Sequence, residues 1–340
     1  PDFGGKIHKA EDEIAAIGAA IGGYYGGVPS ITCTSGPGLS LKQEFIGLAT
    51  ATETPLIVIE VQRGGPATGL PTRTEQSDLL ASLFGTHGDS VRVVLSVTDL
   101  TDCFYAPHVA RYLTEKLRIP VMILSDGFES NSMSVIPKLI CKPMKNVEDI
   151  SDEVLAKFHI RRLTEPIEMV NENQSIPGVP QHMRRIVGLV TNKEGLISTA
   201  APTQKRAHRI RNEKVHAFQR VLDTPSIFGS PEGEILIVGW GTTRGAIEEA
   251  VMKLRAEGVS VSSLSLKVVY PLPLSLKETF LKFNKVVTVE RAYGDDLKPS
   301  PITMLLRNET LLDIRAIISE ATGRPVTPNE VKAKIKGLLS

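Results

Sequence analysis

Short apolar runs alternate with longer amphipathic stretches along the first 130 or so residues. Between residues 11 and 25, Ile14, Ile17 and Ile21 recur at helical spacing, which predicts a helix. Further helices are expected over residues 39–50 and 99–117, and strands over residues 30–34, 56–61, 91–97 and 121–124. Strands that alternate with amphipathic helices predict an α/β fold with a doubly wound, mostly parallel sheet.

A second α/β unit is expected after a long polar, Pro-rich stretch over residues 136–233. That stretch contains a basic helical segment, residues 204–221, which we interpret as a solvated inter-domain helix, with partner binding as the alternative. The second unit begins at ILIVGWGTTRG (residues 235–245) and ends in a helix capped by Thr327 and Glu330. The predicted domains are therefore 1–170, a linker with a helix at 171–232, and 233–340.

Composition narrows the class of protein. The 340 residues have a net charge of +1, and 41% are hydrophobic. There is no basic footprint for nucleic acid, no apolar run long enough for a membrane span and no leader resembling a signal peptide, so we expect a cytoplasmic protein.

The cysteines and histidines give no metal motif. Cys33, Cys103 and Cys141 are far apart, form no CxxC pair and are expected to be small buried hydrophobes in a reducing compartment. An iron–sulfur cluster takes four cysteine ligands, so a cluster housed entirely by these residues is excluded. The histidines show no metal-ligand spacing.

Two glycine-rich turns follow predicted strands: SGPG at residues 35–38 and RGGPATG at residues 63–69. Loops at strand ends are where ligands bind in open α/β sheets, and glycine lets the backbone approach a ligand closely. Arg63 offers a bidentate fork for a carboxylate or phosphate. These features alone predict an anion site on an α/β domain.

The amino-acid sequences of these motifs resemble those of a known family. QRGGPATGLPT (residues 62–72), with TSGPGLSLKQE before it and GTHGD after it, is similar to the α subunit of 2-oxoacid:ferredoxin oxidoreductases, most closely the 2-oxoglutarate (2-oxoglutarate synthase) type. The resemblance implies a pyrimidine-binding-type first domain and a transketolase C-terminal-like second domain. The family's first strand is absent, so we expect a piece of a longer, fused subunit.

The resemblance also implies a reaction and its cofactors. The expected reaction is CoA-dependent oxidative decarboxylation of 2-oxoglutarate to succinyl-CoA, with electrons passed to ferredoxin. Thiamine diphosphate carries the carbanion chemistry. Its diphosphate and Mg²⁺ would be held mainly by the β subunit, and the iron–sulfur cluster would lie in a partner chain. The expected partners are that β subunit, a γ domain or subunit, and ferredoxin.

Five residues match the family's site. Glu13 is expected to bond the cofactor's pyrimidine N1′, and Arg63, fifty positions later, to bind the 1-carboxylate of the oxoacid. Thr72 would line the substrate pocket, and Thr34 and Ser35 would lie near the pyrimidine ring. The alternative for Glu13 is a charge that complements a helix dipole.

Other residues in the matching segments give weaker evidence for a functional role. His87 of GTHGD is open between proton transfer and a loop role. Asp78 and Asp126 are explained equally well by helix capping.

Departures from the family leave alternatives open. The second domain carries ERAYGDDLKPS (residues 290–300) where the family has asparagines and a glutamine, which places contacts of that domain in doubt. The competing hypotheses are the same reaction on pyruvate or a branched-chain 2-oxoacid, and a non-catalytic scaffold. Another thiamine enzyme is disfavoured by the RGGP signature, and GWGTTRG lacks the full dinucleotide-binding fingerprint.

Overall fold

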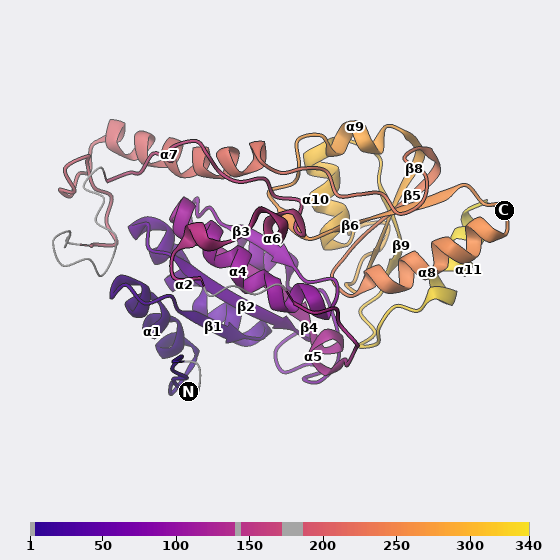
Figure 1. The fold of residues 1–340 in the computed structure, drawn as a ribbon, viewed down its shortest axis with the longest axis horizontal. Helices are drawn as coiled ribbons and strands as arrows, with labels where there is room; N and C mark the ends of the chain where they lie inside the picture. Colours follow the sequence, from indigo (N-terminus) through magenta and orange to yellow (C-terminus); the bar gives the residue numbers. More distant parts are fainter. Residues whose placement is uncertain (1–3, 140–143, 172–185, 340) are drawn as a thin grey trace.

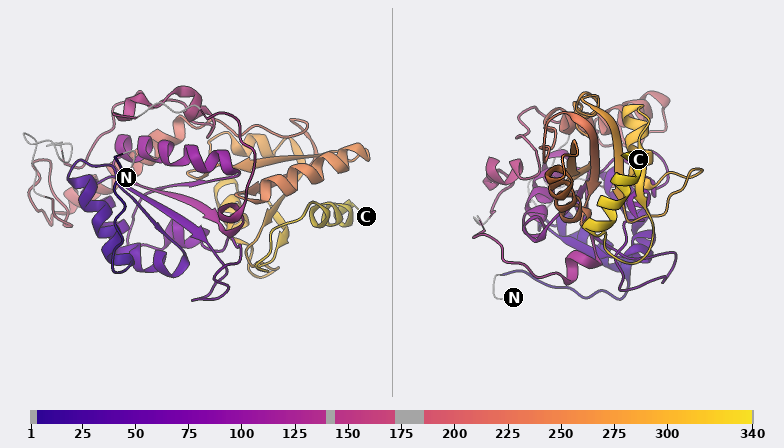
Figure 2. Two further views of the ribbon diagram at one scale, coloured as in Figure 1. Left: turned by 60° about the horizontal axis from the view of Figure 1, so that its bottom comes forward. Right: turned by 90° about the vertical axis from the view of Figure 1, so that its right-hand side faces the viewer.

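Two sheets, each covered by helices on both faces, lie side by side (Figure 1). The structure is a computed structural model that describes residues 4–139, 144–171 and 186–339. The C-terminal helix lies at the far end of the molecule from the N-terminal helix, as the left view of Figure 2 also shows.

The first sheet has the strand order β1-β2-β4-β3-β7. Its strands are β1 (Ile31–Thr34), β2 (Leu56–Gln62), β3 (Val93–Ser96), β4 (Pro120–Asp126) and β7 (Val268–Tyr270). The first four are parallel and β7 is antiparallel to β3. The predicted doubly wound, mostly parallel sheet is confirmed.

Helices cover both faces of this sheet. One face packs against α1 (Glu13–Tyr25), α2 (Gly36–Thr52) and α3 (Leu79–Phe84). The other packs against α4 (Leu100–Leu117), α6 (Asp152–Ala156) and α7 (Ala201–Arg220). Successive side chains of a strand point to opposite faces, so Leu56 and Val58 contact the α2 side while Ile57 contacts the α4 side.

The second sheet is wholly parallel, with the order β6-β5-β8-β9. Its strands are β5 (Gly233–Trp240), β6 (Val261–Leu266), β8 (Phe283–Glu290) and β9 (Arg315–Ser319). Helices α8 (Thr243–Ala256) and α11 (Pro328–Leu339) cover one face, and α9 (Leu276–Phe280) and α10 (Pro301–Thr310) the other. The predicted cap of α11 is confirmed, because Thr327 Oγ1 accepts from Glu330 N and Glu330 Oε2 from Thr327 N.

The two halves share both a strand and a core. Strand β7 belongs to the C-terminal half of the chain yet completes the first sheet, and Ser96 Oγ of β3 donates to Leu266 O at 2.7 Å. One hydrophobic cluster runs from Ile17 and Leu39 of the first half to Trp240 and Ile302 of the second. The remaining described elements are short: α5 (Gly127–Asn131) and η1 (Val147–Asp149).

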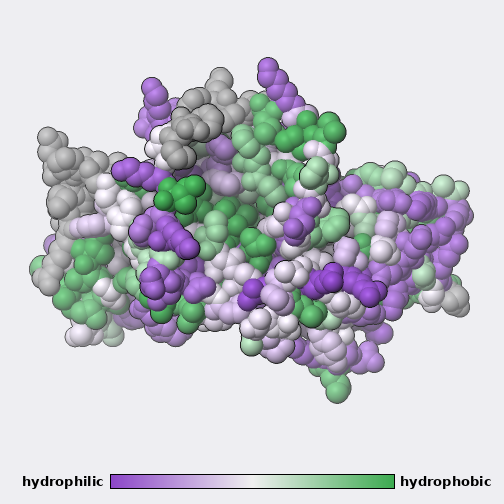
Figure 3. Space-filling view, turned by 90° about the horizontal axis from the view of Figure 1, so that it is seen from below, coloured by the Kyte–Doolittle hydropathy of each residue, from purple (hydrophilic) through white to green (hydrophobic). Residues whose placement is uncertain are grey.

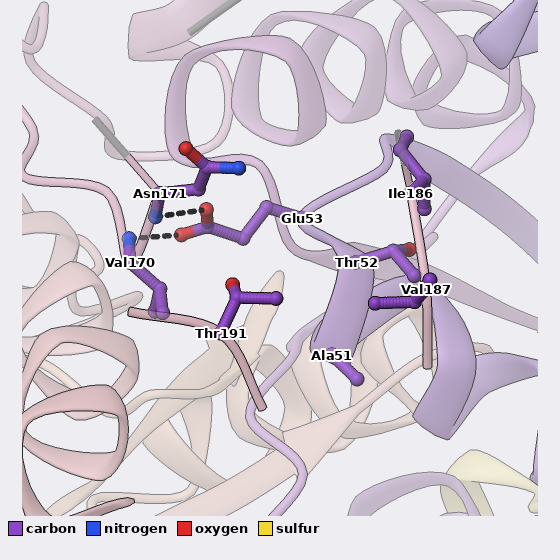
Figure 4. A pocket seen from close by; sticks show the side chains of 8 residues that line it. All are labelled: Ala51, Thr52, Glu53, Val170, Asn171, Ile186, Val187 and Thr191. Carbon is purple, nitrogen blue, oxygen red and sulfur yellow. Dashed lines mark hydrogen bonds between the residues drawn. The ribbon is translucent and has the colours of Figure 1, made fainter. Parts of the chain in front are cut away.

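Helix α7 corrects the prediction of a solvated inter-domain helix. One face of this basic helix is buried, and Lys214 Nζ lies 2.6 Å from Glu53 Oε1, both side chains being almost fully buried. Glu53 ends α2 and also accepts from the amides of Val170 and Asn171 (Figure 4). The sequence did not predict this contact, because a lysine that pairs with a buried carboxylate cannot be distinguished by sequence from a lysine that faces water.

The expectation that the cysteines are buried is wrong for Cys33. Cys33 lies on the edge strand β1 and is exposed, while Cys103 is half-buried. Cys141 lies outside the described residues. Cys33 shares one face of β1 with Ile31, which is also exposed, so this face of the strand is left uncovered while Thr32 on the other face is buried.

In the described residues, no helix combines the length and the apolar character needed to cross a membrane.

Gln76 joins the first half to the second at the carboxyl ends of β5 and β8. Its Nε2 donates to Trp240 O at 2.9 Å, and its Oε1 accepts from Arg291 N at 2.9 Å. Its backbone amide donates to Arg291 O at 2.7 Å. Gln76 is 1% exposed, so water does not replace these bonds.

We predict that Gln76→Glu lowers the free energy of unfolding by about 1–3 kcal/mol at neutral pH, because an ionised carboxylate has no donor for Trp240 O. The loss should shrink as pH falls, because a protonated carboxyl regains a donor. Urea unfolding at two pH values measures this. The same change at exposed Gln204 on α7 is the control, and an equal effect at both positions would contradict the assignment.

Candidate functional site

The carboxyl ends of β1 and β2 form the neighbourhood of the candidate site. These neighbouring parallel strands pair Thr34 with Glu60, so the chain leaves both strands side by side, toward Ser35 and Arg63. Parallel α/β sheets bind ligands at this edge. Helix α2 begins there as well, and its N-terminus favours negative charge.

Glu13 is the first residue of α1, as predicted. Asp12 caps the helix by accepting from Ala15 N at 2.7 Å, so Glu13 is not needed as the cap. The buried Lys42 side chain of α2 donates from Nζ to Glu13 O at 2.8 Å, which fixes the backbone of Glu13. The exposed Glu13 carboxylate has no hydrogen-bond or ion-pair partner among the described residues.

Gly38 allows Glu13 and Thr34 to converge on the first turn of α2. A Cβ on Gly38 would overlap Thr34 Oγ1 and would lie 2.7 Å from Glu13 Cγ and 3.2 Å from Glu13 Oε1. Any side chain at this position would therefore displace both groups. The glycine of SGPG brings a carboxylate from α1 and a hydroxyl from β1 to one point.

The RGGPATGLPT loop folds back on itself beside this point. Gly64 N donates to Arg73 O at 3.2 Å and Gly65 N to Glu75 Oε2 at 3.0 Å. Gly69 has a positive φ, and a Cβ there would overlap Gly64 O, so glycine is required. The closed loop brings Thr72, which is exposed, back to the position where Arg63 leaves β2.

Arg63 is half-buried and unpaired. Its Nε is buried without an acceptor, and within the described ranges no carboxylate forms a salt bridge with it. A buried guanidinium atom that lacks a partner is a group prepared for an external acceptor. Ser35 Oγ, which caps nothing at the start of α2, is also buried and unpartnered.

The sequence analysis missed a buried carboxyl pair beneath these residues. Glu60 of β2 is fully buried, and burial and the facing Asp78 raise its pKa to about 8. Burial and Glu75 raise the pKa of Asp78 to about 6. The available signal was a single acid inside the otherwise apolar strand sequence IVIEV.

Three weaker predictions are resolved by contacts. Asp126 is a cap, because its Oδ1 accepts from Phe128 N and Glu129 N and its Oδ2 from Thr242 Oγ1. Asp78 makes no capping bond to α3. His87 is exposed, and the preceding residue, Thr86, packs against Gly47 of α2. Gly47 is nine residues, or about 14 Å, along α2 from Gly38, so His87 lies away from the point where Glu13 and Thr34 meet.

Three hollows of the described residues lie away from this site. A cavity of about 20 Å³ lies at the opposite end of α2, beside Glu53 (Figure 4). A groove of about 260 Å³ runs between α1, β1 and α4, and another of about 200 Å³ lies beside Lys157 and Lys267. Glu13 and Thr72 are exposed, so the candidate site is an open surface that this chain alone does not enclose.

In residues 4–139, 144–171 and 186–339, no group of three or more His, Cys, Asp or Glu side chains gathers in a way that could hold a metal ion.

Comparison with protein families gives two matches in chain order. Residues 2–193 match the thiamine-diphosphate-binding domain of pyruvate flavodoxin/ferredoxin oxidoreductase. Residues 233–331 match core domain II of pyruvate:ferredoxin oxidoreductase. The first match contains every candidate site residue, from Glu13 to Thr72.

Two similar proteins carry names of the same kind of enzyme. The chain is 35% identical to 2-oxoglutarate oxidoreductase subunit KorA of Mycobacterium tuberculosis, over 100% of this chain and 50% of the relative. It is 32% identical to 2-oxoacid:ferredoxin oxidoreductase 1, subunit alpha, of Aeropyrum pernix, over 98% and 51%. The chain thus spans about half the length of these relatives.

A solved structure is similar throughout. The 2-oxoglutarate:ferredoxin oxidoreductase from Magnetococcus marinus, with 2-oxoglutarate, coenzyme A and succinyl-CoA bound, has a TM-score of 0.81 and 31% identity. The match covers 100% of this chain and 58% of that one. The chain therefore belongs to the pyruvate flavodoxin/ferredoxin oxidoreductase family and carries its thiamine-diphosphate-binding domain followed by core domain II.

Proposed function

We propose that this chain is part of the α subunit of a thiamine-dependent 2-oxoacid:ferredoxin oxidoreductase. The favoured reaction is CoA-dependent oxidative decarboxylation of 2-oxoglutarate to succinyl-CoA, with electrons passed to ferredoxin. The observation that carries this proposal is a pair of unsatisfied charges, Glu13 and Arg63, held beside the carboxyl ends of β1 and β2. The similar proteins named above support the choice of substrate.

Glu13 fits the role of the acid beside an aminopyrimidine ring. Its carboxylate is exposed and unpaired, its backbone is fixed by Lys42, and Gly38 leaves space beside it. When bound, thiamine diphosphate supplies the nucleophile and the electron sink. Glu13 would hold the proton at ring atom N1′, and Thr34 and Ser35 would place hydroxyl groups near the ring.

Arg63 fits the role of the oxoacid anchor. Its guanidinium has a fixed charge and a planar fork that matches a carboxylate. The bond from Gly64 N to Arg73 O supports a role for Thr72, the residue before Arg73, in adding a hydroxyl group beside the bound oxoacid. Fixing the 1-carboxylate at one arginine orients the 2-oxo carbon, and orientation of this kind lowers the reaction barrier.

The open surface calls for a partner chain. Apolar side chains next to the site in sequence are exposed, among them Ile14 of α1, Ile31 of β1 and Leu41 of α2. The face seen from below also carries apolar patches among polar side chains (Figure 3). A β subunit that covers these residues would close the pocket and hold the diphosphate and Mg²⁺. The iron–sulfur cluster would lie in a partner chain.

A dye-reduction assay on the assembled complex tests this function. We expect CoA-dependent reduction with 2-oxoglutarate that exceeds the rate with pyruvate or 2-oxoisovalerate. A preference for another oxoacid would contradict the substrate assignment. Absence of turnover with all three, from a complex shown to be assembled and cluster-loaded, would contradict the activity and favour a scaffold.

We predict that Glu13→Gln lowers kcat about 10²- to 10⁴-fold, which is the range for loss of a positioned acid–base group. The amide cannot give or take the proton at N1′, whereas binding of the oxoacid at Arg63 is unaffected, so its KM should change little. Steady-state kinetics of the complex measures both constants. Glu11→Gln, at an exposed acid two residues away, is the matched control. Equal losses in both variants would refute the assignment.

We predict that Arg63→Lys lowers kcat/KM for 2-oxoglutarate about 10- to 100-fold. Lysine keeps the charge and loses the bidentate fork, and hydrogen bonds to charged groups contribute roughly 1.5–3 kcal/mol. Arg73→Lys in the same loop should change kcat/KM much less, because Arg73 takes part in loop closure through its backbone. An unchanged kcat/KM in Arg63→Lys would remove Arg63 from the site.

A further inference from the structure

We propose that Glu60 and Asp78 share one proton and act as a positioning pair for Arg63, so that oxoacid binding responds to the charge of the pair. The proposal rests on the function proposed above, because it takes Arg63 as the anchor of the oxoacid carboxylate. The four groups that carry it are unpartnered buried atoms gathered at one place: Glu60 Oε1 and Oε2, Asp78 Oδ2, Arg63 Nε and Ser35 Oγ.

Glu60 reaches this place because of strand periodicity. It lies on the same face of β2 as Leu56 and Val58, which pack in the core under α1 and α2. Glu60 pairs in register with Thr34, the last residue of β1, and so lies beneath the first turn of α2. A carboxyl group that is 0% exposed at this position is expensive to keep ionised.

Asp78 meets Glu60 from the loop that contains Arg63. A Cβ on Gly36, the first residue of α2, would lie 3.3 Å from Asp78 Oδ2, so Asp78 lies against the start of that helix. Its amide donates to Gln62 Oε1 at 3.3 Å, which ties it to the end of β2. Glu60 and Asp78 face each other, and Glu60 also faces the backbone amide of Gly36.

The contact requires a proton. Two ionised carboxylates have acceptors and no donor, so neither can satisfy the oxygens of the other. One proton converts the contact into an O–H···O⁻ hydrogen bond, which is short and strong. Two facing carboxyl groups of this kind titrate as a pair, with one pKa raised.

The surrounding charges agree with a singly protonated pair. Arg63 faces both carboxyl groups and lowers the pKa of each, and Glu75 faces Asp78. On the α2 side, Lys42 faces Glu60 as well as Glu13 and Asp12. Burial exceeds these opposing influences and raises the pKa of Glu60 to about 8, so near neutral pH the pair carries one negative charge.

The charge of the pair sets how freely Arg63 binds an external carboxylate. With one negative charge, the pair attracts the guanidinium enough to orient it. Loss of the shared proton adds a second negative charge, which draws Arg63 inward and repels an anionic substrate. The KM for the oxoacid should therefore rise as pH increases through about 8.

The test is the pH profile of KM for 2-oxoglutarate in the assembled enzyme. In the wild type we expect KM to rise roughly tenfold across the transition, as one added unit charge at short range allows. Glu60→Gln keeps a neutral donor toward Asp78 and cannot ionise, so its KM should stay at the low-pH value. Asp78→Asn removes the facing negative charge and should move the transition to lower pH.

A purely structural role would raise KM at every pH and leave the transition in place. Conserved pH dependence in Glu60→Gln would therefore overturn the proposal. Glu44→Gln on α2 is the control, because it tests whether loss of any acid on this helix flattens the profile.

Infrared difference spectroscopy separates this proposal from the proposed function. The wild-type minus Glu60→Gln spectrum should contain a protonated-carboxyl carbonyl band at neutral pH, and the band should vanish above about pH 8. The band without turnover of any oxoacid would keep the proton-sharing pair and reject the function. Turnover of 2-oxoglutarate without the band would reject the pair and keep the function.

Discussion

The buried amide of Gln76 holds the candidate loop between the two sheets. It satisfies Trp240 O and Arg291 N, at the carboxyl ends of two strands in the second half, while its own chain leads back to Arg63 in the first. A side chain that both donates and accepts is required, because the two groups that it meets are of opposite kinds. The position of the loop therefore depends on the second half, whose ERAYGDD segment supplies the backbone of Arg291 to this junction.

Charged side chains are paired at one end of α2 and without a partner in the described residues at the other. At the C-terminal end, Glu53 and Lys214 are buried, paired and hydrogen-bonded, as buried ions must be for stability. At the N-terminal end, Glu13 and Arg63 have no partner in the described residues. The Glu13 carboxylate is exposed to water, whereas Arg63 Nε is buried without an acceptor, and this contrast with the paired end of α2 is the basis for proposing a ligand site here.

Sequence alone predicted the parallel sheet and the convergence of the glycine-rich turns, because periodicity and motif spacing are local signals. The pairing of Glu53 with Lys214 and the role of Glu60 were not predictable, because each depends on neighbours distant in sequence. The same holds for residues 268–270, which pair with a strand of the other half. Exposure of Cys33 depends on which face of β1 the helices leave uncovered, which the sequence does not state.

The most direct test of the account is a structure of the assembled complex with thiamine diphosphate and 2-oxoglutarate bound. The account predicts the aminopyrimidine ring beside the Glu13 carboxylate, within hydrogen-bonding distance of Thr34 or Ser35. It also predicts the 1-carboxylate of the oxoacid on the Arg63 guanidinium. A cofactor ring bound away from Glu13, or an oxoacid carboxylate held by another cation, would contradict the central claim.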